Sequence, residues 1–232
     1  MTNFSAAVNE SLNLTATATA RSRTNLALHH LFAACRLSAR INQIEVENTG
    51  QPFGQFWEEI LQYSLGVAML SVAALESYAN EMYFEGAVLT PGVNAVAAAE
   101  ISEIVDREQI LKKYAIALSI TSAKRLDMGS SSVQDAAILI RLRNAIVHFR
   151  PEWFDDQDQH DKLSKQLASK FQPSAFLPNE AIFPRAWASH SFTVWALRST
   201  VAFLDHFHSE AGLPTPLEKF RSRLSSLSAN AL

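Results

Sequence analysis

Several residue types are scarce in this sequence, and each shortage excludes a class of protein. A single cysteine, Cys35, among 232 residues leaves no partner for an internal disulfide and excludes a zinc site built from several thiolates. The surrounding stretch FAACRL is typical of a small buried side chain rather than a nucleophile. Only 7 glycines and 8 prolines are present, which argues against an architecture of many short strands joined by tight turns.

Charge and long apolar runs are scarce as well. Charged residues make up 19% of the chain and the formal net charge is −3, so any phosphate-binding site is expected to be a local feature. No uncharged apolar run approaches the roughly 18–20 residues of a membrane span. The first residues also lack the basic flank and apolar core of a signal peptide. We therefore expect a cytoplasmic protein without membrane attachment.

The residues that are plentiful favour helices. Hydrophobic residues make up 48% of the chain, and they recur at helical spacing in long Ala- and Leu-rich stretches. We expect helices over about residues 24–46, 55–86, 97–122, 131–149 and 187–211, together with a helix that ends near 171. A break is expected near Asp106. This pattern predicts an all-α protein, an antiparallel helical bundle with additional helical segments at both ends.

The composition also divides the chain. Residues 1–22 are polar and rich in Thr, Ala and Ser, which predicts an N-terminal arm or a weak helix. Residues 23–212 are expected to form one helical domain, and residues 213–232 a short C-terminal tail helix. Within the domain, Ser131 and Gln134 match a capping box at a helix start. Pro151 is expected to end that helix near Phe149.

The most informative stretch is RLRNAIVHFRPEW, residues 141–153, at the end of that helix. One side of the helix is apolar and is expected to face the core, with Leu139, Leu142, Ile146 and Phe149. A second side carries Arg141, Asn144 and His148, and Arg143 projects in a third direction. Ile140 and Val147 lie between these sides. Apolar residues on two sides suggest that a partner subunit covers the second surface.

The polar residues of this stretch suit RNA chemistry. Between Asp135 and Glu152 there are three arginines and no carboxylate, which favours binding of a phosphate. RNA cleavage without a metal requires a base for the ribose 2′-hydroxyl proton, an acid for the leaving oxygen, and cations around the charged phosphorane. An imidazole such as that of His148 can act as base or acid, and an arginine as the cation. A symmetric dimer would bring two such sets together.

The same residues resemble the HEPN superfamily. RNAIVH is similar to its signature, an Arg followed by a polar residue and, after a short interval, a His. ALESYANEMY resembles the earlier long helix of many bacterial members, in which Glu76 and Asn80 face the same way. SHSFTVWALRSTVAFLDHF resembles their closing helix. The resemblance covers roughly residues 55–211.

The resemblance implies an HEPN-like bundle that dimerises about the helix bearing Arg143 and His148. It implies a metal-independent endoribonuclease of toxin–antitoxin or anti-phage systems, with no cofactor. Arg143 and His148 would be the catalytic pair, and Asn144 the polar residue that orients them. Glu76 and Asn80 would support the site by reaching that helix and fixing Arg143. The implied partners are a second copy of the chain, an RNA substrate and an antitoxin or another protein of a defence system.

Two alternatives stay open. Arg141 and Arg150 are candidate contacts to RNA phosphates, but Arg150 stands where some family toxins carry a Tyr that a partner nucleotidyltransferase modifies. Inactivation of this protein by modification of a Tyr at that position is therefore in doubt. Other members have lost catalysis and act as binding modules for RNA, nucleotide or protein. In a protein of that kind, Arg143 and His148 would be polar residues at a solvent-exposed helix end without a catalytic role.

Three further features have mainly structural interpretations. Glu76 and Asn80 can also be a buried hydrogen-bonded pair that holds two helices together. The acidic segment over residues 155–161 is either a metal site or, more commonly for such clusters, a set of helix caps. Trp195 is expected in the core, and tryptophans in general can also stack on bases.

Overall fold

The computed structural model describes residues 24–84, 94–151 and 158–227, which form helices and loops and contain no strand. This confirms the all-α prediction. The long helices are α1 (Leu26–Glu47), α2 (Phe56–Phe84), α5 (Ser131–Val147) and α7 (His190–Ala211). Shorter ones are α3 (Ala95–Asp106), α4 (Ile110–Ser122), α6 (Asp158–Leu167) and α8 (Arg221–Leu227), with single turns η1 (Ile182–Ala186) and η2 (Glu218–Phe220).

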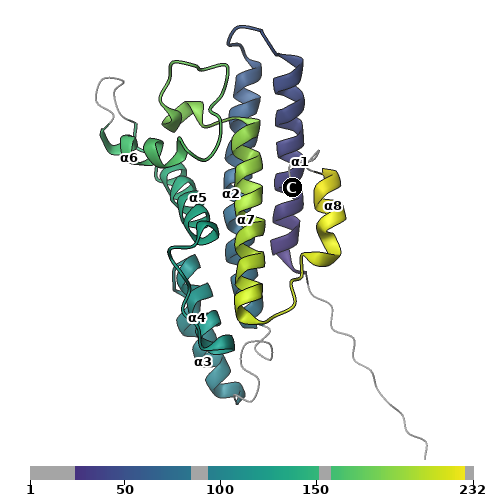
Figure 1. The fold of residues 1–232 in the computed structure, drawn as a ribbon, viewed down its shortest axis with the longest axis vertical. Coiled ribbons are helices and arrows are strands. Elements are labelled where there is room, and N and C mark those ends of the chain that lie inside the picture. The colour runs from purple at the N-terminus through teal and green to yellow at the C-terminus, as the bar shows by residue number, and fades with distance from the viewer. Residues whose placement is uncertain (1–23, 85–93, 152–157, 228–232) are drawn as a thin grey trace, which may run out of the picture.

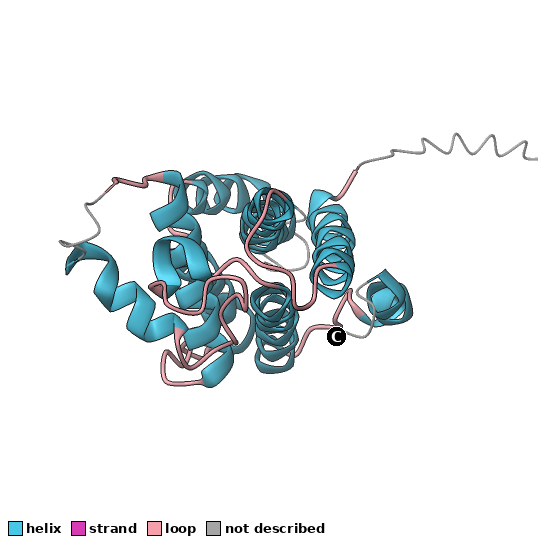
Figure 2. Cartoon of the chain, turned by 90° about the horizontal axis from the view of Figure 1, so that it is seen from above, coloured by secondary structure: helices cyan, strands magenta, loops and turns pink. Residues whose placement is uncertain are grey.

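The long helices lie side by side in a bundle (Figure 1). α1 and α2 form an antiparallel pair, and α7 packs against α1, α2, α4 and α5. Viewed from above, α1, α2 and α7 are seen end-on as neighbouring cylinders, with the α5–α6 side of the molecule beyond them (Figure 2). α8 covers the outer side of α1. α7 is therefore the central helix, and α5 lies on its outer side with one face turned away from the core.

The contact between α1 and α2 depends on one glycine. A Cβ atom added to Gly66 would lie 2.6 Å from Cδ1 of Leu37, well inside van der Waals contact. Any larger residue at position 66 would push the two helices apart or force the leucine into another rotamer. The close approach of α1 and α2 explains why a glycine occurs in the middle of a long helix, where it otherwise costs stability.

The core is closed at the α4 end by a buried tyrosine. Tyr114 is fully buried, and its hydroxyl donates a hydrogen bond to the carbonyl of Leu75 at 2.7 Å. Its ring meets the rings of Phe203 and Phe207 edge-on, at centroid distances of 4.8 and 5.0 Å. Burial raises the pKa of the Tyr114 phenol well above its ordinary value. One side chain thus ties α4 to both α2 and α7.

The ends of α7 follow the expected capping rules, whereas the start of α5 does not. Ser189 accepts a hydrogen bond from the N–H of Phe192 at 3.1 Å, and Gly212 ends α7 with φ of 67°. The predicted capping box at Ser131 and Gln134 is wrong. The N-cap of α5 is Ser130, and its hydroxyl donates to the carbonyl of Asp127 at 3.0 Å rather than accepting from the first turn.

Other predicted boundaries agree to within a few residues. The break predicted near Asp106 is the junction between α3 and α4. α5 ends at Val147, two residues before the predicted end. The predicted tail helix is present as η2 and α8. The predicted arm over residues 1–22 lies outside the described residues.

Among the described helices, α2 alone has the length and apolar content that crossing a membrane requires. In its most apolar window of 18 residues, 44% are buried within the bundle. A core helix of a bundle meets the same criterion, because its apolar residues are covered by neighbouring helices. α2 packs against α1, α4, α5 and α7.

A buried histidine on α7 predicts an acid-sensitive fold. His208 is buried, and its Nε2 lies 2.6 Å from the hydroxyl of Tyr78 on α2. Burial lowers the pKa of His208 below its ordinary value of 6.5, although the nearby Asp205 carboxylate acts in the opposite direction. The unfolded chain therefore binds a proton at a higher pH than the folded chain does. We expect the free energy of unfolding to fall as the pH drops below about 6.5.

The measurement is the urea midpoint between pH 7.5 and 5.5 for the wild type, His208→Gln and His206→Gln. His208→Gln should flatten the pH dependence because glutamine does not titrate, while its amide oxygen can still accept a hydrogen bond from Tyr78. His206 is only half-buried and serves as the matched control. An equal flattening in both variants would contradict the assignment to His208.

Candidate functional site

The C-terminal end of α5 presents most of the predicted site residues to solvent. Arg141, Asn144 and His148 are exposed. His148 is the C-cap residue of α5, and its backbone N–H donates to the carbonyl of Asn144 at 2.9 Å. The imidazole therefore lies beside the carbonyl end of a helix, where the helix dipole attracts positive charge. It is not enclosed in the apolar core, so it is accessible to a substrate.

Arg143 faces the neighbouring helix α2. Its Nη2 lies 3.6 Å from Oε2 of Glu76, and the two side chains are 25% and 45% exposed. A half-exposed ion pair of this kind contributes little stability, but it restricts the direction of the guanidinium group. The sequence contains no carboxylate between Asp135 and Glu152, but the packing of α2 against α5 brings the Glu76 carboxylate to Arg143. The structure thus places Glu76 beside Arg143.

Asn80 lies one turn further along α2 and has a different partner. Its Oδ1 accepts a hydrogen bond from Nζ of Lys113 on α4 at 2.7 Å. Lys113 is only 2% exposed, so its ammonium group needs a polar partner close by. The contact of Asn80 thus joins α2 to α4, and it is Glu76 rather than Asn80 that contacts Arg143.

α6 packs across the end of α5 and holds the chain that leaves it. The rings of Phe149 and His160 are stacked at 5.6 Å with an angle of 11° between their planes. Nε2 of His160 also lies 3.2 Å from the backbone carbonyl of Arg150. Arg141 donates a hydrogen bond to the side chain of Gln166. These contacts anchor the backbone around His148, while the side chain of Arg150 stays exposed.

Next to these polar residues the surface is apolar. A groove of about 460 Å³ lies between α2, the end of α5 and the η1 segment. Its lining includes Leu61, Leu65, Ile146, Phe149, Phe183 and Trp187. Val147 and Phe149 are 53% and 44% exposed. Phe149, which is expected to face the core, is instead partly exposed at the groove. On the second apolar side Val147 is uncovered in the single chain, whereas Ile140 is half-buried and packs against the core.

One chain alone does not direct its two proposed catalytic residues at a common point. Arg143 and His148 are five residues apart, so on an ideal helix their side chains leave the axis in directions about 140° apart. Arg143 points to α2, whereas His148 lies at the exposed end. Any phosphate bound by both groups would need a second copy of the same surface, or a movement of the arginine away from Glu76.

The described residues contain no group of three or more His, Cys, Asp or Glu side chains placed to hold a metal ion. Two residues of the acidic segment have other contacts. His160 stacks on Phe149, and Asp161 pairs with Lys165 at 3.0 Å. Asp155 and Asp156 lie outside the part of the chain that the structure describes.

Neither protein family models, nor curated proteins, nor solved structures give a match. Only the chemistry of the site itself and the motif resemblance therefore bear on the function of the protein.

Three features near or beyond this site were not foreseen from the sequence. They are the hydrogen bond between Arg141 and Gln166, the stacking of His160 on Phe149, and a polar pocket at the opposite end of α5. Each joins residues that are far apart in the sequence. Periodicity within one helix carries no signal for such contacts.

Proposed function

We propose that this protein is a metal-independent endoribonuclease of HEPN type, in which two copies of the α5 end form one composite site. The observation that carries the proposal is the part-buried Arg143 with the exposed Asn144 and His148, at motif spacing, on a helix end beside an uncovered apolar groove. These groups supply a cation and a titratable imidazole for a phosphate substrate.

In the proposed reaction, one imidazole removes the proton from the ribose 2′-hydroxyl. The 2′-oxygen attacks the adjacent phosphorus, and the bond to the 5′-oxygen of the next nucleotide breaks. The second imidazole of the dimer donates a proton to that leaving oxygen, which gives a 2′,3′-cyclic phosphate and a 5′-hydroxyl. The guanidinium groups of Arg143 stabilise the charge on phosphorus, because a planar donor suits an oxyanion.

The supporting residues follow from their contacts. Glu76 restrains the guanidinium of Arg143 before substrate binds. The exposed Arg141 and Arg150 extend the positive charge toward flanking phosphates. Because the chain is acidic overall, with a formal net charge of −3, this local charge favours a narrow range of RNA substrates. A role in toxin–antitoxin or anti-phage defence, with an antitoxin or another defence-system partner, rests on the resemblance alone.

The deciding experiment is incubation of the pure protein with total RNA in the presence of excess EDTA. We expect discrete fragments with 2′,3′-cyclic phosphate termini, which block ligation of an adaptor to the 3′ end until the phosphate is removed. Cleavage that requires an added divalent metal would contradict the proposed mechanism. Binding of RNA without cleavage would instead favour the catalytically inactive binding module.

A further inference from the structure

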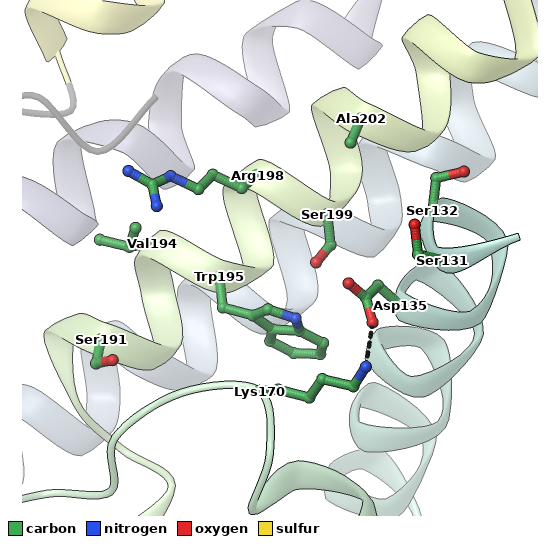
Figure 3. A pocket seen from close by; sticks show the side chains of 10 residues that line it. All are labelled: Ser131, Ser132, Asp135, Lys170, Ser191, Val194, Trp195, Arg198, Ser199 and Ala202. Atoms are coloured by element: carbon green, nitrogen blue, oxygen red, sulfur yellow. Dashed lines mark ion pairs between the residues drawn. The ribbon is translucent and has the colours of Figure 1, made fainter.

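A second pocket lies at the opposite end of α5, about 25 Å along the helix from His148 at 1.5 Å per residue. It has a volume of about 370 Å³ and lies between the first turn of α5, the middle of α7 and the segment that follows α6 (Figure 3). Unlike the groove beside His148, it is lined largely by polar side chains. The serines among them are Ser131, Ser132, Ser191 and Ser199.

The inner wall of this pocket contains a buried hydrogen-bond donor without a partner. Trp195 is 8% exposed, and its Nε1 makes no hydrogen bond to any described residue. Its ring is held by Phe171 and Phe192, at centroid distances of 5.5 and 6.2 Å. In Figure 3 the indole nitrogen lies on the edge of the ring that faces Asp135 and Ser199. A buried unpaired N–H is costly, and a ligand acceptor would remove that cost.

The outer wall adds further donors. α5 begins at Ser131 without a side-chain cap, because the hydroxyl of Ser130 is directed to Asp127. The first-turn N–H groups of a helix have no partner within the helix and lie at the positive end of its dipole. Ser131 and Ser132, which carry two of these N–H groups, line the pocket. Two independent sets of donors, the helix start and the indole, therefore border one cavity.

The charged residues of the pocket determine what it can accept. Asp135 and Lys170 form an ion pair at 2.7 Å, with each side chain 25% exposed. The carboxylate is thus already neutralised by a partner. The guanidinium of Arg198 points away from this pair in Figure 3, so we assign it no role in binding. Oδ1 of Asp135 makes this ion pair and no further hydrogen bond. The donors that remain without a partner are the indole N–H of Trp195 and the first-turn N–H groups, and donors require a ligand that supplies acceptors.

We propose that this pocket binds the oxyanion group of a small molecule, between the first turn of α5 and the indole N–H of Trp195. Phosphate and carboxylate groups share this chemistry. The site is separate from the proposed ribonuclease site, and its test requires no enzymatic activity. It therefore stands or fails independently of RNA cleavage.

The experiment is an NMR titration of the whole protein, labelled with ¹⁵N, at constant ionic strength maintained with sodium chloride. The probes are inorganic phosphate and acetate, which differ in shape and charge. We expect a saturable shift of the Trp195 indole N–H signal and of the Ser132 backbone amide with at least one probe. The probe that saturates at the lower concentration identifies the kind of oxyanion. The absence of a saturable shift with both probes would overturn the proposal.

Substitutions within the pocket then test each donor. Trp195→Phe keeps an aromatic ring but removes the N–H, and should weaken binding about tenfold when followed at Ser132. Trp57→Phe is the matched control, because Trp57 also has a buried Nε1 that makes no hydrogen bond to the described residues, but it does not line this pocket. Equal weakening in both variants, or none in Trp195→Phe, would contradict the role of the indole.

The sign of a charge substitution separates an oxyanion from other ligands. Asp135→Asn removes the nearest negative charge and frees Lys170, so it should tighten oxyanion binding roughly threefold or more. Weaker binding in Asp135→Asn would mean that the carboxylate holds a cation or a hydroxyl group of the ligand, which would overturn the proposal.

Ser131→Pro removes one first-turn N–H at a position where proline is tolerated, and Ser130 already has the extended backbone that precedes proline, with ψ of 142°. This variant should weaken binding severalfold without loss of helix in circular dichroism. Unchanged binding would contradict the role of the helix start. If the variant loses helix, Asp135→Asn and Trp195→Phe still decide the proposal.

Discussion

His148→Ala is expected to lower the rate of RNA cleavage by about 10²- to 10⁴-fold, the usual contribution of a general acid or base. In a symmetric dimer one substitution removes both imidazoles, so neither the 2′-hydroxyl nor the leaving oxygen retains its proton-transfer partner. His148 is exposed at the C-cap of α5, and its backbone N–H rather than its ring bonds to Asn144. The fold should therefore tolerate alanine. The measurement is single-turnover cleavage of a labelled RNA with excess EDTA.

Two comparisons make this result specific to catalysis. His29→Ala alters an exposed histidine on α1, a helix that packs against α2, α7 and α8, and should leave the rate unchanged. RNA binding by His148→Ala, followed by fluorescence anisotropy, should stay within about threefold of the wild type, because the arginines provide most of the phosphate attraction. Full activity in His148→Ala, with an unchanged thermal midpoint, would exclude the proposed mechanism.

The positions of the helices follow from local patterns, and for that reason most of them were predictable. Apolar residues at steps of three and four predicted a long helix over about 55–86, and α2 occupies Phe56–Phe84. The break predicted near Asp106 is the junction between α3 and α4. The helix start at Ser131 agrees with the prediction, but the N-cap is Ser130 rather than Ser131, because both serines are acceptable N-cap residues and only the backbone distinguishes them.

The candidate site was predictable only in part. Spacing places Asn144 and His148 at one helix end, but whether Arg143 has an acidic partner depends on how α2 packs against α5. The fold supplies Glu76 for that purpose. Asn80 lies one turn away on α2, but its side-chain oxygen accepts a hydrogen bond from the buried Lys113 on α4 and does not contact Arg143. The need of a buried ammonium group for a partner cannot be read from α2 alone.

The proposed oxyanion pocket could not be predicted from the sequence at all. Asp135, Lys170 and Trp195 belong to three separate segments, and none stands out in the sequence. Trp195 was expected in the core, and it is buried there, but the position of its N–H relative to the start of α5 is a property of the tertiary structure. A buried donor becomes informative only when its surroundings are known.

The second large effect concerns assembly, and Val147→Asp is expected to abolish dimer formation and RNA cleavage together. Val147 is the last residue of α5, follows the groove residue Ile146 in the sequence and is 53% exposed, so in the single chain an aspartate there remains in contact with water. In a dimer built on this surface the carboxylate would be buried without a partner. That costs about 3–5 kcal/mol, or more than a hundredfold in the dissociation constant.

Light scattering after gel filtration measures the mass, and the cleavage assay is run at the same protein concentration. Val96→Asp is the matched control, since Val96 is 74% exposed on α3 and lies away from the groove. It should leave mass and activity unchanged. Because Arg143 and His148 diverge on one helix, a monomer holds only half of the proposed site. A Val147→Asp protein that is monomeric and still cleaves RNA at the wild-type rate would show that one chain suffices, and the composite site would have to be abandoned.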